Sequence, residues 1–365
     1  MVTDLLGKSS TNNLFAASDQ FRIIGSAIVE EGVYSGKLRI KSFNQEDGSF
    51  IGQNTVYADD PNSKSLYFSC SQADIIYAVG VTYDEGGTNS YDILVVAFSK
   101  DNEVLWIRRI GEAGRFERGY NVTIDNENNL VVGGIKAIEV ESNSYNPWLL
   151  KFDINGELLW DKTFVGLGNR NNLVSLSTDS ENNIYALVNN KPNLEMTVSK
   201  FTSSGDSLWT QSYLIEESPL GKEIKMLKND EFIISGNAII APYTYRIPIY
   251  LKIDKEGNKL WSKEYAEVIG GASYESFMKI TSDQKIAKVY DSKGYPTLMI
   301  IDTEGNVEYT REYSQVDHFF SINLVELDDG SFIILGYISS NLHPENHTFW
   351  LLRTDQMVTL RHWIS

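Results

Sequence analysis

An internal repeat is the feature that most constrains the fold of this chain. The stretch PWLLKFDINGELLW (147–160) reads as two short strands around a D-x-N-G turn, and it ends in tryptophan. Related phrases begin at Lys37, Asp92, Met196, Ile249 and Thr297, with a degraded copy at Phe349. Self-similarity at a fixed period indicates a protein built from one repeated supersecondary unit.

A second phrase alternates with the first and consists of a turn residue followed by an apolar run that usually ends in glycine. Its last position falls at Gly25, Gly80, Gly134, Val188, Gly236, Val289 and Gly336. Both phrases therefore occur seven times with a period near 50 residues. Each unit divides into four strands, and turn pieces such as Asn155-Gly156 supply a residue that tolerates positive φ between paired strands.

Seven units of four antiparallel strands predict an all-β fold, a seven-bladed β-propeller. A four-stranded sheet cannot bury both faces alone, whereas radial stacking buries each sheet against its neighbours. A β-helix or open solenoid is the alternative, but solenoids use shorter rungs and capping repeats. We expect an N-terminal segment over 1–13 and a single propeller domain over 14–365. The repeats are expected at approximately 14–64, 65–118, 119–171, 172–220, 221–272, 273–319 and 320–365.

The chain is long enough for seven whole blades with little or no strand exchange where the ring closes. Alternatively, Thr3 to Leu6 lend an edge strand to the last blade.

The segments RGYNVTIDNENNLVVGGI (118–135) and NPWLLKFDINGELLWDKTFVG (146–166) carry a family resemblance. They resemble the seven-bladed β-propeller repeats of bacterial exported proteins, and the resemblance covers roughly residues 14–365. The phrase ending in tryptophan also looks like quinoprotein-type propeller repeats, although their A-x-D-x-x-T-G-x-x-x-W form is absent. The resemblance implies a fold more than an activity, because such proteins have diverse roles, and no cofactor is expected.

Charge and hydropathy restrict the class of partner. With 49 acidic and 32 basic residues the net charge is −17, which argues against nucleic-acid binding and against an anionic membrane surface. No apolar run is long enough to span a bilayer. The single cysteine, Cys70, excludes an internal disulfide. The resemblance to exported repeats implies a bacterial protein that is secreted, periplasmic or on the cell surface. It leaves open whether a signal peptide or a lipoprotein anchor precedes residue 1.

One tryptophan recurs at the same place in the fourth strand of the repeat, at Trp106, Trp160, Trp209 and Trp261. A ring of such residues suits sugar-binding platforms, as in propeller lectins, or packing between neighbouring blades. Lectin pockets need polar partners beside the ring, but leucine precedes every one of these tryptophans. The pattern therefore favours packing.

The loops between the second and third strands vary in length and are rich in aromatic residues, unlike the repeated framework. Variable aromatic loops on a rigid scaffold suit partner recognition, and the alternative is that they cover the ends of the blades. The candidate partner-binding residues in them are Tyr145, Trp148, Tyr243, Tyr245 and Trp350.

Arginines gather in the link IRRIGEAGRFERGYN (107–121) of this acidic chain. Arg115 and Arg118, with Arg170 from the next link, have the geometry to hold a carboxylate, a sulfate or an acidic sugar. The alternative is ion pairing with neighbouring acids such as Glu112 and Glu117.

No catalytic or metal motif is recognisable. His343 and His347 have the spacing of half a metal site without further ligands, and DNENN (125–129) and DSENN (179–183) lack the glycine and glutamate of calcium loops. Hairpin turns explain the last two segments better. We therefore expect no metal site and no catalytic residue set.

These observations favour a non-catalytic recognition or scaffold propeller, a monomer or a subunit of a larger complex, that binds a protein or carbohydrate (glycan) partner through one loop face. One alternative is a lyase or hydrolase acting on an anionic substrate at the channel mouth, with Arg115, Arg118, Arg170 and His318 as candidate residues. Another is a structural subunit of an envelope complex.

Overall fold

The structure is a computed structural model, and the strands account for nearly all of its ordered elements. It describes residues 12–17, 20–27, 37–57, 64–72, 75–83, 91–99, 101–139, 144–164, 172–190, 195–215, 219–239, 246–266, 272–275, 277–292, 295–313, 319–339, 347–355 and 360–364. Among these residues, one 3-10 turn, η2 (Lys228–Asp230), lies between two strands. Within these residues no helix has the length and apolarity that a bilayer crossing requires.

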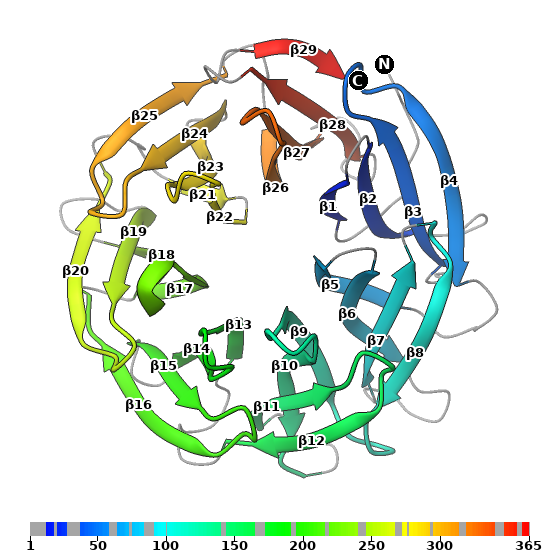
Figure 1. Ribbon diagram of the computed structural model, residues 1–365, viewed down its shortest axis with the longest axis vertical. Coiled ribbons are helices and arrows are strands. Elements are labelled where there is room, and N and C mark those ends of the chain that lie inside the picture. Colours follow the sequence, from blue (N-terminus) through cyan, green and yellow to red (C-terminus); the bar gives the residue numbers. More distant parts are fainter. Residues whose placement is uncertain are drawn as a thin grey trace. The chain divides into compact units, whose positions relative to one another are not determined.

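The strands form seven antiparallel sheets, each following chain order from its first to its fourth strand (Figure 1). The first three sheets are β1 (Asn12–Ala17), β2 (Gln20–Ala27), β3 (Lys37–Asn44) and β4 (Phe50–Tyr57); β5 (Lys64–Gln72), β6 (Ile75–Tyr83), β7 (Tyr91–Ser99) and β8 (Val104–Ile110); and β9 (Glu117–Ile124), β10 (Leu130–Ala137), β11 (Tyr145–Phe152) and β12 (Leu158–Thr163).

The fourth and fifth sheets are β13 (Asn172–Thr178), β14 (Ile184–Asn190), β15 (Glu195–Phe201) and β16 (Ser207–Tyr213); and β17 (Leu220–Met226), β18 (Phe232–Ile239), β19 (Arg246–Ile253) and β20 (Lys259–Glu264). The last two are β21 (Ala272–Glu275), β22 (Lys279–Ile280), β23 (Ile286–Ser292), β24 (Tyr295–Ile301) and β25 (Val307–Glu312); and β26 (Phe319–Glu326), β27 (Phe332–Ser339), β28 (His347–Thr354) and β29 (Leu360–Ile364). In the sixth sheet β21 and β22 both pair with β23 and together take the place of a first strand. The fold is a seven-bladed β-propeller with four antiparallel strands per blade, as the repeat predicts.

Two compact units make up the chain. One comprises Met1–Thr55, Ile240–Ile249 and Lys263–Ser365, and the other comprises Val56–Ile239 and Tyr250–Ser262. The second unit contains the second, third and fourth blades, which carry the site described below.

Each turn of the D-x-N-G type is closed by its own aspartate. In the third blade Asp153 Oδ1 accepts the main-chain N–H groups of Asn155 at 2.9 Å and Glu157 at 2.8 Å. Gly156 takes a φ of +77°, which a residue with a Cβ adopts only at a cost. Local chemistry therefore determines where the third strand ends and the fourth begins.

A β-bulge before the tryptophan sets the direction of the indole. Lys151 pairs with Trp160 and Phe152 pairs with Leu158, so Leu159 is the extra residue, and it is 52% exposed. A bulge bends its strand and re-aims the neighbouring side chain. The same register shift places Leu105 and Leu208 as extra residues in β8 and β16.

The re-aimed tryptophan packs on the turn of the next blade. Trp106 donates its indole N–H to the carbonyl of Ile154 at 3.0 Å, and a Cβ added to Gly156 would lie 2.7 Å from the Trp106 ring. Trp160 donates in the same way to Ser203 at 3.2 Å, against Gly205. The recurring tryptophans thus join consecutive blades. The turn glycine is needed twice, because it adopts the positive φ of the turn and leaves room for the indole ring.

The recurring glycine of the second strand allows close contact with the main chain of the first strand of the same blade. A Cβ on Gly134 would lie 2.1 Å from the carbonyl oxygen of Arg118, and a Cβ on Gly236 would lie 2.5 Å from that of Leu220. Both glycines face a register shift in the first strand. Glycine at this position therefore allows the bulged first strand to lie in close contact with the second strand.

In the first unit, the last and first blades pack together without exchanging strands among the described residues. Leu14, Ile23 and Phe43 share one apolar cluster with Leu327, Ile333, Leu335 and Leu351, and Arg353 donates to the carbonyl groups of Gln45 and Glu46. Thr3 to Leu6, the segment considered for an exchanged strand, lie outside the described residues.

Replacing Trp160 with alanine is expected to lower the free energy of unfolding by about 3–5 kcal/mol, because a large interblade side chain and its hydrogen bond are lost. Leu159→Ala in the same strand is the control and should cost less than about 1 kcal/mol, since Leu159 is exposed. Urea denaturation measures both. Unchanged stability with loss of sugar binding would support the lectin interpretation instead.

Gly156→Ala and Gly330→Ala separate the two roles of the turn glycine. Both residues have positive φ, +77° and +76°, but only Gly156 meets a ring, whereas no atom lies within 4 Å of a Cβ at Gly330. Both substitutions should cost about 1–2 kcal/mol of backbone strain. Gly156→Ala should cost a further 1–3 kcal/mol, roughly, from overpacking. Equal losses in thermal denaturation would show that the tryptophan contact imposes no requirement for glycine.

Candidate functional site

One end of each blade carries the turns between the first and second and between the third and fourth strands; we call it the turn rim. In the third blade its segments are residues 125–129 and 153–157. DNENN forms a hairpin turn in which Asp125 Oδ1 accepts the main-chain N–H groups of Glu127 at 2.9 Å and Asn129 at 2.8 Å. Among the described residues, no group of three or more His, Cys, Asp and Glu side chains is placed to hold a metal ion.

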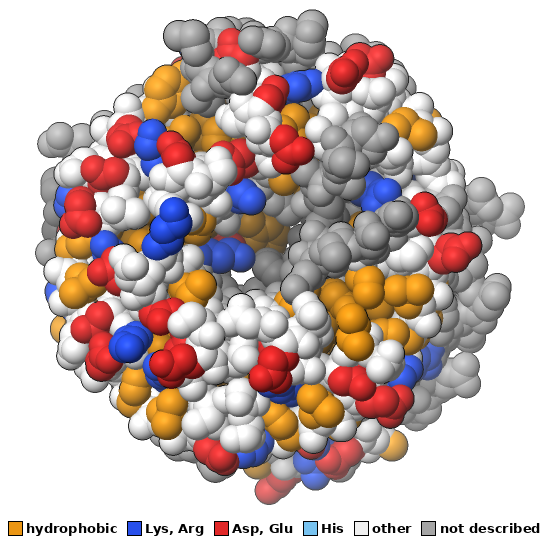
Figure 2. Space-filling model, viewed as in Figure 1, with side chains coloured by type: hydrophobic (Ala, Val, Ile, Leu, Met, Phe, Trp, Pro, Cys, Tyr) orange, Lys and Arg blue, Asp and Glu red, His pale blue; other side chains and the backbone are white. Residues whose placement is uncertain are grey.

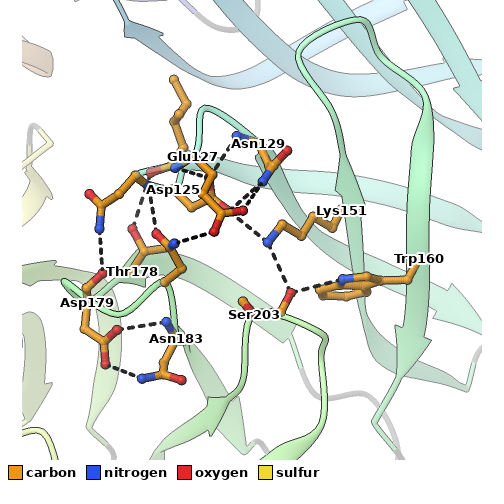
Figure 3. A network of polar contacts seen from close by, with 12 residues as sticks. Asp125, Glu127, Asn129, Lys151, Trp160, Thr178, Asp179, Asn183 and Ser203 are labelled. Carbon is orange, nitrogen blue, oxygen red and sulfur yellow. Dashed lines mark hydrogen bonds and ion pairs between the residues drawn. The ribbon is translucent and has the colours of Figure 1, made fainter.

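Charged groups on the turn rim are used in joining blades. Lys151 Nζ lies 2.8 Å from Asp125 Oδ2 and donates to the carbonyl of Ser203 in the next blade at 3.1 Å (Figure 3). The indole N–H of Trp160 reaches the same carbonyl. A second buried pair joins Lys200 to Asp179 at 3.2 Å, and the buried Lys252 pairs with the partly exposed Glu231 at 2.9 Å. Because the buried charges are paired and hydrogen-bonded, this rim has a structural role.

The opposite end of the third blade, the link rim, carries the link from β8 to β9 and the loop from β10 to β11. Strand register brings the two segments together, since Glu117 pairs with Lys136 and Ala137 pairs with Tyr145. Eight side chains of the second and third blades gather here, and we call them the rim cluster: Tyr91, Glu112, Arg115, Phe116, Glu117, Arg118, Lys136 and Trp148.

Arg118 lies against a pair of aromatic rings. Its Cζ lies 4.8 Å from the ring centre of Tyr91 and 4.5 Å from that of Phe116. The two rings are 5.0 Å apart and nearly perpendicular, at 76°. The main-chain N–H of Tyr91 also donates to the carbonyl of Arg115 at 3.1 Å. Cation–π contacts with both rings restrict the position of the guanidinium.

Glu112 joins the other two cations of the cluster. Its Oε2 is 3.0 Å from Arg115 Nε, and its Oε1 is 2.6 Å from Lys136 Nζ. Lys136 Nζ also lies 4.7 Å from the ring centre of Trp148, whose indole N–H donates to Asp161 at 2.9 Å. Lys136 and Arg115 together lower the pKa of the Glu112 carboxyl, Lys136 having the larger effect. Glu112 thus remains ionised and holds the link against β10.

Glu117 lies in the middle of these charges but shares none of their hydrogen bonds. Its side chain is buried, with 0% exposure, and within the part of the chain that the structure describes neither carboxylate oxygen makes a hydrogen bond of ordinary geometry. Burial raises its pKa to about 7, opposed by the main-chain amide of Glu112 and the charge of Lys136. The negative charges of Asp92 and Glu112 contribute to the rise. A carboxyl in such surroundings is neutral in mild acid.

The structure places some of the binding residues predicted from the sequence in the rim cluster, and others lie outside the described residues. Arg115 and Arg118 meet in the rim cluster, and Tyr145 is half-buried at the start of β11. Trp148 is only 2% exposed, so its contribution to a binding surface would act through Lys136. Tyr243, Tyr245, Arg170 and His318 lie outside the described residues, and only the backbone of Trp350 is described, in β28.

Two expectations about the charges need refinement. Arg115 is partnered by Glu112, as the ion-pair alternative predicts, but Glu117 takes no part in such a pair. Arg108 belongs to the turn rim, where its Nε donates to the carbonyl of Gly156 at 2.7 Å and its guanidinium pairs with Glu157 at 3.0 Å. Sequence reasoning missed Lys136, whose ion-pair partner Glu112 lies more than 20 residues away in the chain.

Comparison with known proteins shows the fold and no more. No protein-family model and no curated protein matches the sequence, so membership of the bacterial repeat family stays a prediction. A crystal structure of a protein from Lactobacillus plantarum is similar with a TM-score of 0.61 and 9% identity, covering 94% of this chain and 95% of that one. A quinohemoprotein alcohol dehydrogenase from Comamonas testosteroni gives 0.50 and 8%, covering 99% and 68%.

An acylaminoacyl peptidase from Pyrococcus horikoshii is similar with a TM-score of 0.57 and 12% identity. The similarity covers 95% of this chain and 52% of the peptidase, so the chain spans about half of that enzyme's length. The solved structures that share this fold include enzymes, but the similarity shows the fold alone, and function has to be argued from the site.

Stability is expected to depend on pH through Glu117. Its pKa is about 7 in the folded protein and ordinary, 4.5, when unfolded. The neutral carboxyl is therefore favourable to folding below about pH 4.5, and this contribution is lost as pH rises through 7. The unfolding free energy of Glu117→Gln minus that of wild type should increase as pH rises from 5 to 8, by up to about 3 kcal/mol. Urea denaturation across that range checks it, and a pH-independent difference would contradict the burial argument.

Proposed function

We propose that this protein is a non-catalytic recognition propeller that binds a protein or glycan partner through the link rim of its third blade. The observation that supports this proposal is the rim cluster, where two arginines are held in place on a surface that the framework does not require. Aromatic rings and arginine are the side chains most often responsible for binding energy at interfaces. Groups already restricted in the free protein lose little entropy on binding.

Comparison between blades supports a specialised role for this rim. Gly134 pairs with Gly119 in the third blade, and Gly236 pairs with Gly221 in the fifth. One position outward, Arg118 in the third blade corresponds to Leu220 in the fifth. The blade fold thus accepts an apolar residue at this place. In contrast, the lysine and tryptophan contacts of the turn rim recur from blade to blade.

We also propose export to the periplasm or cell surface, alone or as a subunit of an envelope complex. The resemblance to exported propeller repeats supports this location. Fractionation of the native cells tests it, and recovery with the cytoplasmic fraction would count against it.

Binding of anionic partners should depend on Arg115 and Arg118. We expect Arg115→Ala and Arg118→Ala each to weaken binding by about tenfold or more, since a charge-assisted hydrogen bond contributes about 1.5–3 kcal/mol. Biolayer interferometry against a panel of acidic and neutral polysaccharides and native surface extracts measures this loss.

Lys162→Ala is the matched control, because Lys162 forms an exposed ion pair with Asp206 on the turn rim, at 2.7 Å. It should bind as wild type does. A captured partner that both arginine variants retain at full affinity would place the binding site elsewhere.

A further inference from the structure

Glu117 is a buried carboxyl that the surface contacts of the rim cluster do not use. It starts β9 and lies opposite Lys136 of β10, yet Lys136 Nζ binds Glu112 at 2.6 Å. Neither oxygen of Glu117 makes a hydrogen bond of ordinary geometry in the described ranges, although the main-chain amide of Glu112 acts on its carboxyl. An ionised carboxylate in this position would have that one amide and no cation bound to it, which is less than a buried charge requires. The observed arrangement therefore suits the neutral acid.

The charged groups that face Glu117 come from three neighbouring elements. Lys136 lies on β10, Glu112 on the link from the second blade, and Asp92 on β7. A Cβ on Gly111 would meet Asp92 Oδ1 at 2.0 Å, so the Asp92 carboxylate sits directly against the link. Ionisation of Glu117 would add a third negative charge to this small region and would attract Lys136 away from Glu112.

The net charge of the cluster consequently depends on one proton. Within the rim cluster, Arg115, Arg118 and Lys136 bring three positive charges and Glu112 brings one negative charge, and the neighbouring Asp92 brings a second negative charge. The sum is one positive charge with neutral Glu117 and zero with ionised Glu117. Interactions between charges at such short range are weakly screened when they are partly buried.

We propose that Glu117 is a proton-dependent regulator of anion binding at the rim cluster, with a carboxylate-bearing glycan as the ligand. Neutral Glu117 leaves the Lys136–Glu112–Arg115 chain intact and the cluster positive. Ionised Glu117 cancels that charge and competes with Glu112 for Lys136, which loosens the link that carries Arg115 and Arg118. Affinity for the anion falls as pH rises through neutrality. The inference rests on the proposed function, since it names the ligand class and the regulation of the same rim.

Linkage sets the size of the effect. A bound anion favours neutral Glu117, and a ligand that raises the pKa of this group by half to one unit binds about three to ten times more weakly above the transition than below it. A pH-independent affinity would mean that ligand and proton are not coupled.

The binding experiment uses the full chain and polygalacturonate, whose carboxylates stay ionised throughout the range. Isothermal titration calorimetry runs from pH 6.0 to 8.0 at constant ionic strength, with methyl-esterified polygalacturonate as the uncharged polymer. We expect wild type to lose about three- to tenfold in affinity across this range. Glu117→Gln should bind with the low-pH affinity throughout, and Glu117→Met provides the same neutral state if the amide folds poorly. The esterified polymer should not bind.

Glu139→Gln is the matched control, since Glu139 is exposed on the same rim and loses the same charge. It should follow the wild-type pH dependence with at most a constant offset. A wild-type affinity that does not change with pH, or a pH dependence that persists in both Glu117 variants, would overturn the inference.

A second measurement without ligand separates this inference from the proposed function. Hydrogen exchange of the segments 111–119 and 135–139 should accelerate beyond the intrinsic pH effect between pH 6 and 8 in wild type, and not in Glu117→Gln. Absence of this transition would overturn the regulation even if polygalacturonate binds. A normal transition without binding at any pH would instead overturn anion recognition by this rim.

Discussion

The packing of a fourth-strand tryptophan on the turn of the following blade is the contact on which the rest of the structure depends. A blade has two apolar faces and is stable only when both are covered. The bulge at Leu159 aims Trp160 at the next blade, and the positive-φ glycine of the next turn leaves room for the ring. Turn, bulge and tryptophan therefore have to occur together, which is why the repeat in the sequence is so regular.

This contact also separates the two ends of a blade. On the turn rim, lysines such as Lys151 are buried in ion pairs and in hydrogen bonds to the next blade, so substitutions there act on stability. The link rim is free of that requirement in the third blade, and its residues can differ from those of other blades. A framework with one invariant and one variable end concentrates recognition at the variable end.

Part of the candidate site was predictable. Arg115 and Arg118 stand out in an acidic chain by composition alone, and their neighbours in sequence include Glu112, which does pair with Arg115. The isolation of Glu117 was not predictable, because proximity in sequence suggested another ion pair. Its raised pKa follows from burial and from the negative charges of Asp92 and Glu112, while Lys136, which binds Glu112 and lies over Trp148, opposes the rise. These are relations between strands and between blades, which local patterns do not report.

The sequence by itself determined the strand count, the turn positions and the seven-bladed architecture, because each depends on local preferences that repeat: aspartate and glycine in turns, alternation in strands, and tryptophan at a constant place. It also determined which residue types were available for recognition. Only the tertiary structure decided how those residues are used. Strand register placed Lys136 beside Glu117, the neighbouring blade supplied Tyr91 to hold Arg118, and burial raised the pKa of one carboxyl. Desolvation and charge proximity depend on distances in space, and these arise only when the blades are assembled.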